Sequence, residues 1–165
     1  MTRTFIQGET VVDVITLRPV TRENFSACLK LHLPPEQQRH VAPNVYSLAE
    51  AYVTPEFEPR AIYAADELVG FAMYGLETET GRWWIIRLMI ERAQQGRGYG
   101  RAALGALVDQ IVTHHQPREL VISTGPDNEQ ALGLYRSFGF RDTGEIDGGE
   151  LVLKLDPAVL AAREG

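Results

Sequence analysis

The sequence predicts an α/β (α+β) fold in which a mixed, mostly antiparallel sheet of six to seven strands is flanked by about four helices. Short apolar runs alternate with amphipathic stretches, hairpin-type strands occur at both ends of the chain, and one strand–helix–strand crossover lies between them. The 165 residues and 44% hydrophobic content suit one globular domain. We therefore expect a single domain over 1–165, with a core at about 14–155 and a short C-terminal tail at 156–165.

The first third of the chain contains patterns for one strand and two helices. Residues 12–18 ("VDVITLR") alternate as a strand, and apolar residues at spacing four within 25–33 predict a helix capped by Thr21. The following "PPEQQRHVAPN" has no regular pattern. The "SLAE" at 47–50 has the form of a capping box, so we expect a short helix there that ends at Pro55.

The middle of the chain predicts three consecutive strands. Residues 60–76 are typical of two strands around a tight turn at 66–67, and 82–90 ("RWWIIRLMI") is typical of a buried strand. Because side chains alternate across a strand, one of Trp83 and Trp84 should face the core and the other a cleft or partner surface.

The last third alternates helices and strands. After a glycine-rich stretch, a helix should run to about His115 and stop at Pro117. A strand at 119–124 and a helix at about 128–137 follow, and a final strand pair should turn at 147–149 ("DGG").

Composition excludes several classes of protein. The net charge of −6 argues against nucleic-acid binding and is compatible with cationic small molecules or basic protein tails. No stretch approaches the roughly 18 apolar residues of a membrane span, and "MTRTFIQGETVVDV" has no leader pattern, so a cytoplasmic protein without membrane partners is expected. Cys28 is expected to pack in the core, and no His or Cys spacing suggests a metal.

The stretch "QQGRGYGRAALGALV" places three glycines directly before a predicted helix. Gly96, Gly98 and Gly100 would let the chain turn sharply and bring N–H groups to the positive end of that helix, which forms a phosphate cradle. The alternative is a turn that binds nothing. A P-loop is excluded, because no Lys-Ser/Thr follows a G-x-x-x-x-G spacing. "GYGRAA" formally fits the dinucleotide fingerprint G-x-G-x-x-A, but it does not open a βαβ unit.

A different spacing fits better. Gln95-x-x-Gly98-x-Gly100 resembles the Q/R-x-x-G-x-G/A signature of the GNAT N-acetyltransferases, and "NEQALGLYRSFGF" at 128–140 resembles that family's second conserved segment. "LVGFAMYGL", "GRWW…R" and "GRGYGRAAL" together look like its diamine and spermidine acetyltransferase branch. The resemblance implies the GNAT fold, with the sheet splayed at its central strands and acetyl-coenzyme A as co-substrate.

The resemblance also implies roles for individual residues. A bulged strand before the cradle would pair its backbone with the pantetheine arm, and its N–H groups could stabilise the oxyanion. Asn128 would also bind the pantetheine, or else it or Asp127 only caps a helix. Tyr135 would protonate the departing thiolate as general acid, or else it is a core aromatic. The expected cofactor-binding residues are Leu88, Met89, Ile90, Gln95, Gly96, Arg97, Gly98, Tyr99, Gly100, Arg101, Asn128 and Tyr135.

The general base is less defined by the sequence. An alkylamine with a pKa of about 10.4 is neutral only about once in a thousand at neutral pH, which costs roughly 4 kcal/mol unless a group takes its proton. Many family members place a carboxylate on the strand before the cradle, where this chain has Trp84, Ile85 and Ile86. Glu77 and Glu79 are candidates for a base or amine anchor, and a water chain could also take the proton. The alternative for the two acids is a pair of solvated carboxylates.

The sequence hypothesis is therefore an enzyme that moves acetyl from acetyl-coenzyme A to a primary amine in a ternary complex. A small polyamine or diamine is the leading acceptor. The alternatives are acetylation of a protein N-terminus, lysine, amino acid or aminoglycoside, a coenzyme A sensor without turnover, and a nucleotide-binding protein. A homodimer is compatible with the sequence.

Overall fold

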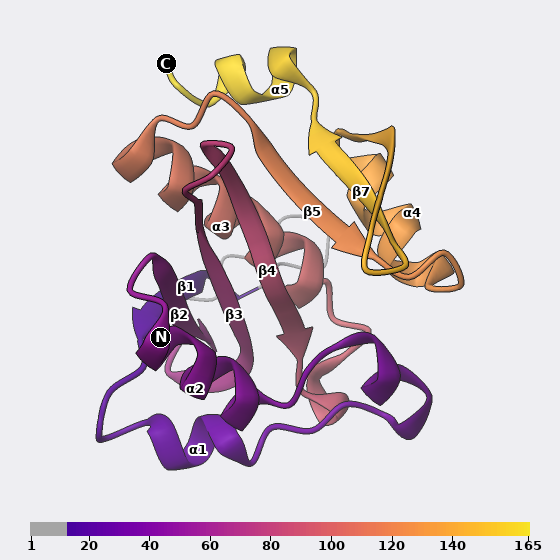
Figure 1. The fold of residues 1–165 in the computed structure, drawn as a ribbon. Coiled ribbons are helices and arrows are strands. Elements are labelled where there is room, and N and C mark those ends of the chain that lie inside the picture. Colours follow the sequence, from indigo (N-terminus) through magenta and orange to yellow (C-terminus); the bar gives the residue numbers. More distant parts are fainter. Residues whose placement is uncertain (1–12) are drawn as a thin grey trace, which may run out of the picture.

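A seven-stranded sheet with the strand order β1-β2-β3-β4-β5-β7-β6 forms the framework of the computed structural model, which describes residues 13–165 (Figure 1). Every neighbouring pair is antiparallel except β4 and β5. The predicted mixed, mostly antiparallel sheet is confirmed. The strands are β1 (Ile15–Pro19), β2 (Phe57–Ala64), β3 (Glu67–Glu77), β4 (Arg82–Ile90), β5 (Leu120–Thr124), β6 (Phe140–Asp147) and β7 (Glu150–Leu155).

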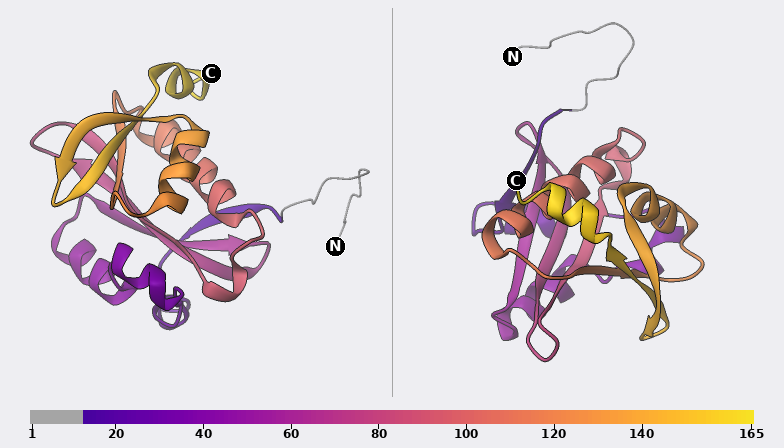
Figure 2. Two further views of the ribbon diagram at one scale, coloured as in Figure 1. Left: turned by 90° about the vertical axis from the view of Figure 1, so that its right-hand side faces the viewer. Right: turned by 90° about the horizontal axis from the view of Figure 1, so that it is seen from above.

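Helices cover both faces of the sheet, with α1 and α2 on one side and α3 on the other (Figure 2). They are α1 (Phe25–Leu29), α2 (Asn44–Val53), α3 (Tyr99–His115), α4 (Glu129–Phe138), α5 (Pro157–Ala162) and the 3-10 helices η1 (Pro35–His40) and η2 (Arg92–Gln94). The predicted crossover is confirmed, because α3 connects β4 to the parallel strand β5. The predictions for residue 12 and for the N-terminal stretch before it lie outside the described residues.

Two groups of buried side chains hold these layers together. The larger group lies between the sheet and α3 with α4, and the smaller group of Phe71, Met73 and Met89 lies under α2 and the segments that follow α1 and η1. Strand β3 contributes to both groups, because its side chains alternate across the sheet. Trp83 packs against the larger group, as the alternation of the tryptophans predicts for one of the pair.

The N-terminal helices begin at other residues than the sequence predicts. Thr21 is not the N-cap of α1, which starts at Phe25 after a turn in which the Asn24 side chain accepts from the backbone N–H of Thr21 at 2.8 Å. Ser47 opens no capping box, because α2 already begins at Asn44 after a proline and Ser47 is buried inside it. A turn over 22–24 precedes the first of these helices, and Pro43 sets an earlier start for the second. The irregular stretch in between contains η1.

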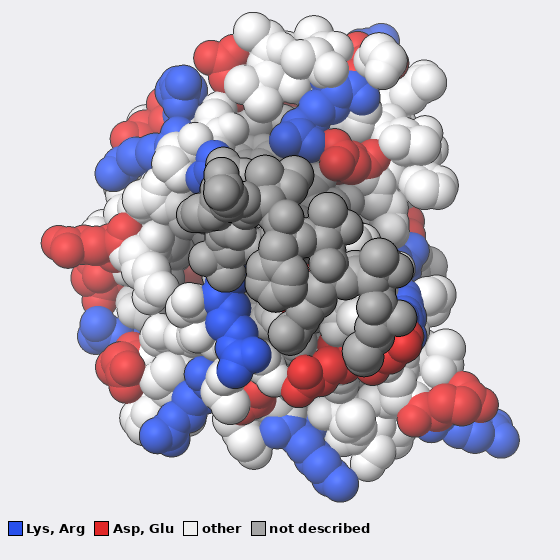
Figure 3. All heavy atoms as spheres, turned by 180° about the vertical axis from the view of Figure 1, so that it is seen from behind, with Lys and Arg blue, Asp and Glu red and all other residues white. Residues whose placement is uncertain are grey.

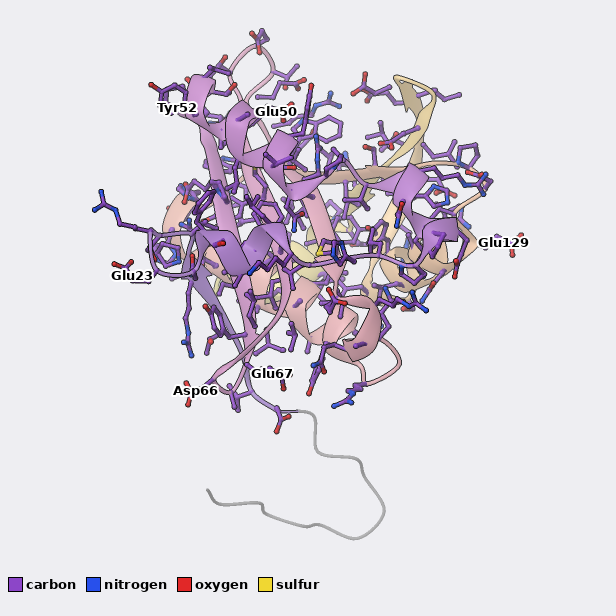
Figure 4. All side chains as sticks on the ribbon, turned by 90° about the horizontal axis from the view of Figure 1, so that it is seen from below. Glu23, Glu50, Tyr52, Asp66, Glu67 and Glu129 are labelled. Carbon is purple, nitrogen blue, oxygen red and sulfur yellow. The ribbon has the colours of Figure 1, made fainter. Side chains whose placement is uncertain are left out.

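The β2–β3 and β6–β7 hairpins both turn through residues with positive φ. The β2–β3 turn lies one residue earlier than predicted, at Ala65–Asp66, with Ala65 at φ 51°. Asp66 and Glu67 stand at this turn in Figure 4. The β6–β7 turn is where the sequence predicts it, and Gly148 (φ 55°) and Gly149 (φ 87°) supply the two positive φ values that a tight hairpin turn requires.

The sheet splays between its central strands. Strand β4 pairs with β5 only from Trp83 to Ile85, and the two arrows then diverge in Figure 1. The β3–β4 register shifts after Met73, which leaves Ile86 as the extra residue of a β-bulge in β4. The splay and the bulge implied by the family resemblance are therefore present.

The face seen from behind has no dominant charge among its described residues. Where described side chains are visible from behind, acidic and basic residues are interspersed (Figure 3). Within residues 13–165, no helix combines the length and the apolar character needed to cross a bilayer. The segment 156–165, expected as a tail, includes α5, whose Leu160 is buried against the larger group.

Candidate active site

A large cleft opens where β4 and β5 diverge. Its volume is about 1190 Å³, and its walls come from β4, β5, the glycine loop, η1, α4 and the β6–β7 hairpin. Trp84 lines it, which confirms that one tryptophan faces a cleft. The guanidinium of Arg82 lies 5.1 Å from the Trp84 ring centroid, so a cation of the protein itself already occupies one face of that ring.

Leu88, Met89 and Ile90 form one side of the opening. All three line the cleft, and on their other edge they pair with β3. Among the described residues, no strand pairs with the edge that faces β5 beyond Ile85. Backbone groups of this edge are therefore available to an extended ligand, as expected for the pantetheine arm.

The glycine loop lies at the wide end of the cleft. Gly96 (φ 78°) and Gly98 (φ 81°) adopt left-handed backbone, which side chains disfavour, and Gly98 is the N-cap of the 17-residue helix α3. The loop thus turns directly into a helix N-terminus, where N–H groups and the helix dipole favour an anion. Gly100 differs from the expectation, because it lies inside α3 without a positive φ and serves no turn.

Gln95 anchors this loop. Its side-chain amide donates to the carbonyl of Ile90 at 3.1 Å and to Gln37 Oε1 at 2.9 Å. Gln37 in turn donates to Gln130 at 3.4 Å. Gln95 and Gln37 together therefore link β4, η1 and α4, so η1 bridges the two sides of the cleft.

The two arginines of the loop point in different directions. Arg101 lines the cleft and donates to Ser137 Oγ at 2.7 Å, whereas Arg97 does not line it. Arg97 lies instead beside the hydroxyl of Tyr99, which hydrogen-bonds Asp13 at 3.0 Å. The Tyr99 ring is buried in the larger core group, although the residue also lines the cleft.

Asn128 caps α4 and lines the cleft. Its carboxamide oxygen accepts from the backbone N–H of Ala131 at 3.3 Å, and its nitrogen donates to Thr124 Oγ1 at 3.0 Å. Asp127, the alternative cap, instead forms an ion pair with Arg39 at 3.0 Å. The cap is therefore Asn128 itself.

Tyr135 is 8% exposed and lines the cleft from α4. Within residues 13–165 its hydroxyl makes no hydrogen bond, so the oxygen remains available to a ligand. Burial, with a smaller contribution from the nearby Glu150 carboxylate, raises the pKa of Tyr135 to about 12. The hydroxyl therefore keeps its proton throughout the neutral range. Its ring also lies 6.2 Å from the Phe140 ring, so the residue packs in the core and lines the cleft at the same time.

Glu77 lines the end of the cleft away from the glycine loop, and its carboxylate already has hydrogen-bond partners within the protein. Its carboxylate accepts from the Thr80 hydroxyl and from Arg82 Nε at 3.3 Å, and these bonds lower its pKa. Arg82 also forms two bonds to Glu145, at 2.8 and 3.2 Å. A carboxylate with a lowered pKa is a weak proton acceptor, which disfavours Glu77 as base. Glu79 lines the same end.

Sequence reasoning missed Glu150 and Ser123. The Ser123 hydroxyl donates to Glu150 Oε2 at 2.6 Å, and both residues line the cleft. Glu150 follows the β6–β7 turn, but β7 inserts between β5 and β6 in the sheet. No local pattern encodes that insertion, so nothing in the sequence placed Glu150 beside β5. The part of the chain that the structure describes contains no group of three or more His, Cys, Asp or Glu side chains arranged for a metal.

A splayed sheet with a bulged strand, and a glycine loop with a helix N-terminus at the gap, define the architecture of an acetyltransferase that uses acetyl-coenzyme A. A family model described as "Acetyltransferase (GNAT) family" matches residues 25–140. The chain belongs to this family of N-acetyltransferases. It is also 33% identical over 146 residues to the spermine/spermidine N(1)-acetyltransferase of Bacillus subtilis (strain 168), a match that covers 84% of this chain and 96% of the relative.

Solved structures share the fold at lower identity. The spermidine N-acetyltransferase from Vibrio cholerae in complex with CoA and spermine aligns with a TM-score of 0.68 and 17% identity over 86% of this chain and 93% of that one. The aminoglycoside acetyltransferase AAC(6')-Ib in complex with coenzyme A aligns with a TM-score of 0.74 and 17% identity over 90% and 98%. These alignments confirm the GNAT fold.

Proposed function

We propose that this acetyltransferase acts on a small polyamine or diamine. The observation that carries the proposal is the acidity of the cleft beside the splay. Five carboxylates line it: Glu56, Glu77, Glu79, Asp147 and Glu150. Several like charges in one concave site attract and hold a polycation more strongly than a monoamine.

The basic side chains of the cleft do not cancel this charge. Arg87 lies 3.7 Å from Glu50 and Arg39 lies 3.0 Å from Asp127, so each faces a carboxylate outside the cleft lining. Figure 4 shows Glu50 on α2. Arg101 belongs to the glycine-loop end, where an anionic pyrophosphate is expected. Of the five cleft carboxylates, only Glu77 has a basic partner within residues 13–165, Arg82, so the other four remain to attract a cation.

The coenzyme end supports direct transfer in a ternary complex. The backbone from Leu88 to Ile90 would hold the pantetheine and polarise the thioester carbonyl, and the loop from Gln95 to Arg101 would hold the pyrophosphate. Asn128 would contact the pantetheine in addition to capping α4. Tyr135 would donate its proton to the leaving thiolate. The expected homodimer remains a prediction.

The test is a comparison of acceptors with the purified protein. Coenzyme A release is measured with acetyl-coenzyme A and spermidine, spermine or putrescine, with butylamine as a monoamine of similar reach. We expect kcat/KM for spermidine to exceed that for butylamine by at least about tenfold, and raising the salt concentration to reduce the difference. Equal values for the two amines would contradict the proposal.

An aminoglycoside is the second candidate, because it is also a polycation and the acidic lining suits it equally. Paromomycin in the same assay separates the two, since a polyamine enzyme should acetylate spermidine faster. A protein N-terminus or lysine predicts turnover of a basic peptide instead. A coenzyme A sensor predicts binding without turnover of any amine.

A further inference from the structure

The carboxylates that line the cleft differ in their hydrogen-bond and ion-pair partners. Glu77 is bound by Thr80 and Arg82, which also binds Glu145. Glu150 has no basic partner within residues 13–165, and only one of its oxygens is used, by Ser123 Oγ at 2.6 Å. The other oxygen, Oε1, is therefore free to accept a proton from a ligand.

Glu150 also lies at the reacting end of the cleft. Ser123 lies on β5, one residue beyond the last β4–β5 pair, and its hydrogen bond brings the carboxylate to the point where the strands diverge. Tyr135 lines the same cleft. Among the described residues, Glu150 is the carboxylate whose charge contributes to the raised pKa of Tyr135. The Glu150 carboxylate and the Tyr135 hydroxyl, which burial keeps protonated, therefore line the same cleft.

We infer that Glu150 holds the attacking amine and takes its proton as the new C–N bond forms. This inference rests on the proposed function, and it assigns the base that the strand before the glycine loop does not supply. Ser123 acts as a positioning residue, since its hydroxyl fixes Oε2 and leaves Oε1 without a partner among the described residues.

The proton balance of the step is complete. The ammonium loses one proton to water before attack, and the neutral nitrogen then adds to the thioester carbonyl. As the C–N bond forms, the nitrogen becomes positive and acidic, and its proton passes to Glu150 Oε1. The C–S bond breaks, and the thiolate takes the Tyr135 proton. Glu150 then returns its proton to the Tyr135 phenolate, directly or through water, which restores both residues and gives amide, thiol and one net proton.

The test compares Glu150→Gln with the parent and with Asp142→Asn. Asp142 belongs to the same hairpin but pairs with Arg136 at the surface and does not line the cleft. For Glu150→Gln we expect kcat with spermidine to fall about 100-fold, because a positioned base contributes about 10²–10⁴-fold. KM for acetyl-coenzyme A should stay within about twofold, Glu150→Asp should recover part of kcat, and Asp142→Asn should match the parent.

A second readout does not depend on turnover. Calorimetric titration of spermidine into the complex with coenzyme A should give about tenfold weaker binding for Glu150→Gln, since a charged hydrogen-bond partner is lost. An unchanged kcat, or a rise in KM for spermidine alone, would overturn the inference while the proposed function stands. A parent protein that neither binds nor acetylates any amine would overturn both.

Discussion

The two ends of the cleft are built in different ways. The coenzyme end consists of backbone: the free edge of β4, the left-handed turns at Gly96 and Gly98, and the N-terminus of α3. The acceptor end consists of side chains from separate segments, such as Glu77 at the end of β3 and Glu150 at the start of β7. Backbone groups can bind acetyl-coenzyme A, which is the same in every reaction of the family. Side chains can differ from one member to the next and so suit different acceptors.

The difference teaches where each kind of substitution should act. Changes of backbone conformation should damage coenzyme binding and leave the choice of amine intact. Changes of charged side chains at the far end should alter amine recognition and leave coenzyme binding intact. Tyr135 stands between the two ends and should affect the chemistry alone.

The largest effect is expected for Tyr135→Phe. We expect kcat to fall about 100-fold or more, with KM for both substrates within about threefold, because only the proton donor is lost. Steady-state kinetics with acetyl-coenzyme A and spermidine measures this. With a pKa of about 12, the parent should show no loss of kcat from this group up to about pH 10, since the acid loses its proton only as the pH rises through its pKa.

The control for that variant is Tyr52→Phe. Tyr52 is 89% exposed on α2 and projects outward in Figure 4. Thermal unfolding should be nearly unchanged in Tyr135→Phe, because its hydroxyl has no hydrogen bond within the described residues. Full activity of Tyr135→Phe would show that the tyrosine only packs.

The backbone end is tested by Gly98→Ala with Gly105→Ala as its matched control. Gly98 has φ 81°, where alanine costs about 1–2 kcal/mol, so coenzyme A binding and stability should both fall. Gly105 lies in α3 outside the cleft lining, and a Cβ there would meet Phe138 at an ordinary 3.8 Å, so alanine should stabilise the helix by up to about 1 kcal/mol and leave coenzyme A binding unchanged. Denaturant unfolding and coenzyme A titration check both. Equal losses in the two variants would refute the distinction.

The smallest effect is expected for Glu77→Gln. Because Arg82 and Thr80 hold Glu77, kcat should stay within about threefold of the parent. The pKa of Glu77 is lowered from 4.5 by the Thr80 hydroxyl first and by Arg82 less, so its contribution to stability is present above that value and is lost as the pH falls below it.

The parent should therefore unfold at a slightly higher temperature than Glu77→Gln at neutral pH, and the difference should vanish in acid. Thermal melts at a series of pH values measure it. A tenfold loss of kcat would instead assign the role of base to Glu77.

The sequence predicted the coenzyme end better than the acceptor end, for a physical reason. Residues 82–115 contain a strand, three glycines and a helix start in direct succession, so their local pattern predicts the geometry. Gly100 is the one glycine of the three that was assigned wrongly to the turn. The helix starts predicted at Thr21 and Ser47 were wrong, because a turn over 22–24 precedes α1 and because α2 already starts after Pro43.

The acceptor end depends on contacts that span the chain. Ser123 and Glu150 meet only because β7 inserts between β5 and β6, and Arg82 reaches Glu145 over 63 positions. Such contacts leave no periodic or local signal. Glu77 and Glu79 were found as candidates because they follow a strand, but their partners could not be read from that position.

The most direct test of the account is coenzyme A release by the parent protein with acetyl-coenzyme A and either spermidine or butylamine, beside a coenzyme A titration. The account predicts coenzyme A binding, fast turnover with spermidine and at least about tenfold lower kcat/KM with butylamine. Coenzyme A binding without turnover of spermidine would contradict the claim that the acidic end receives a polyamine.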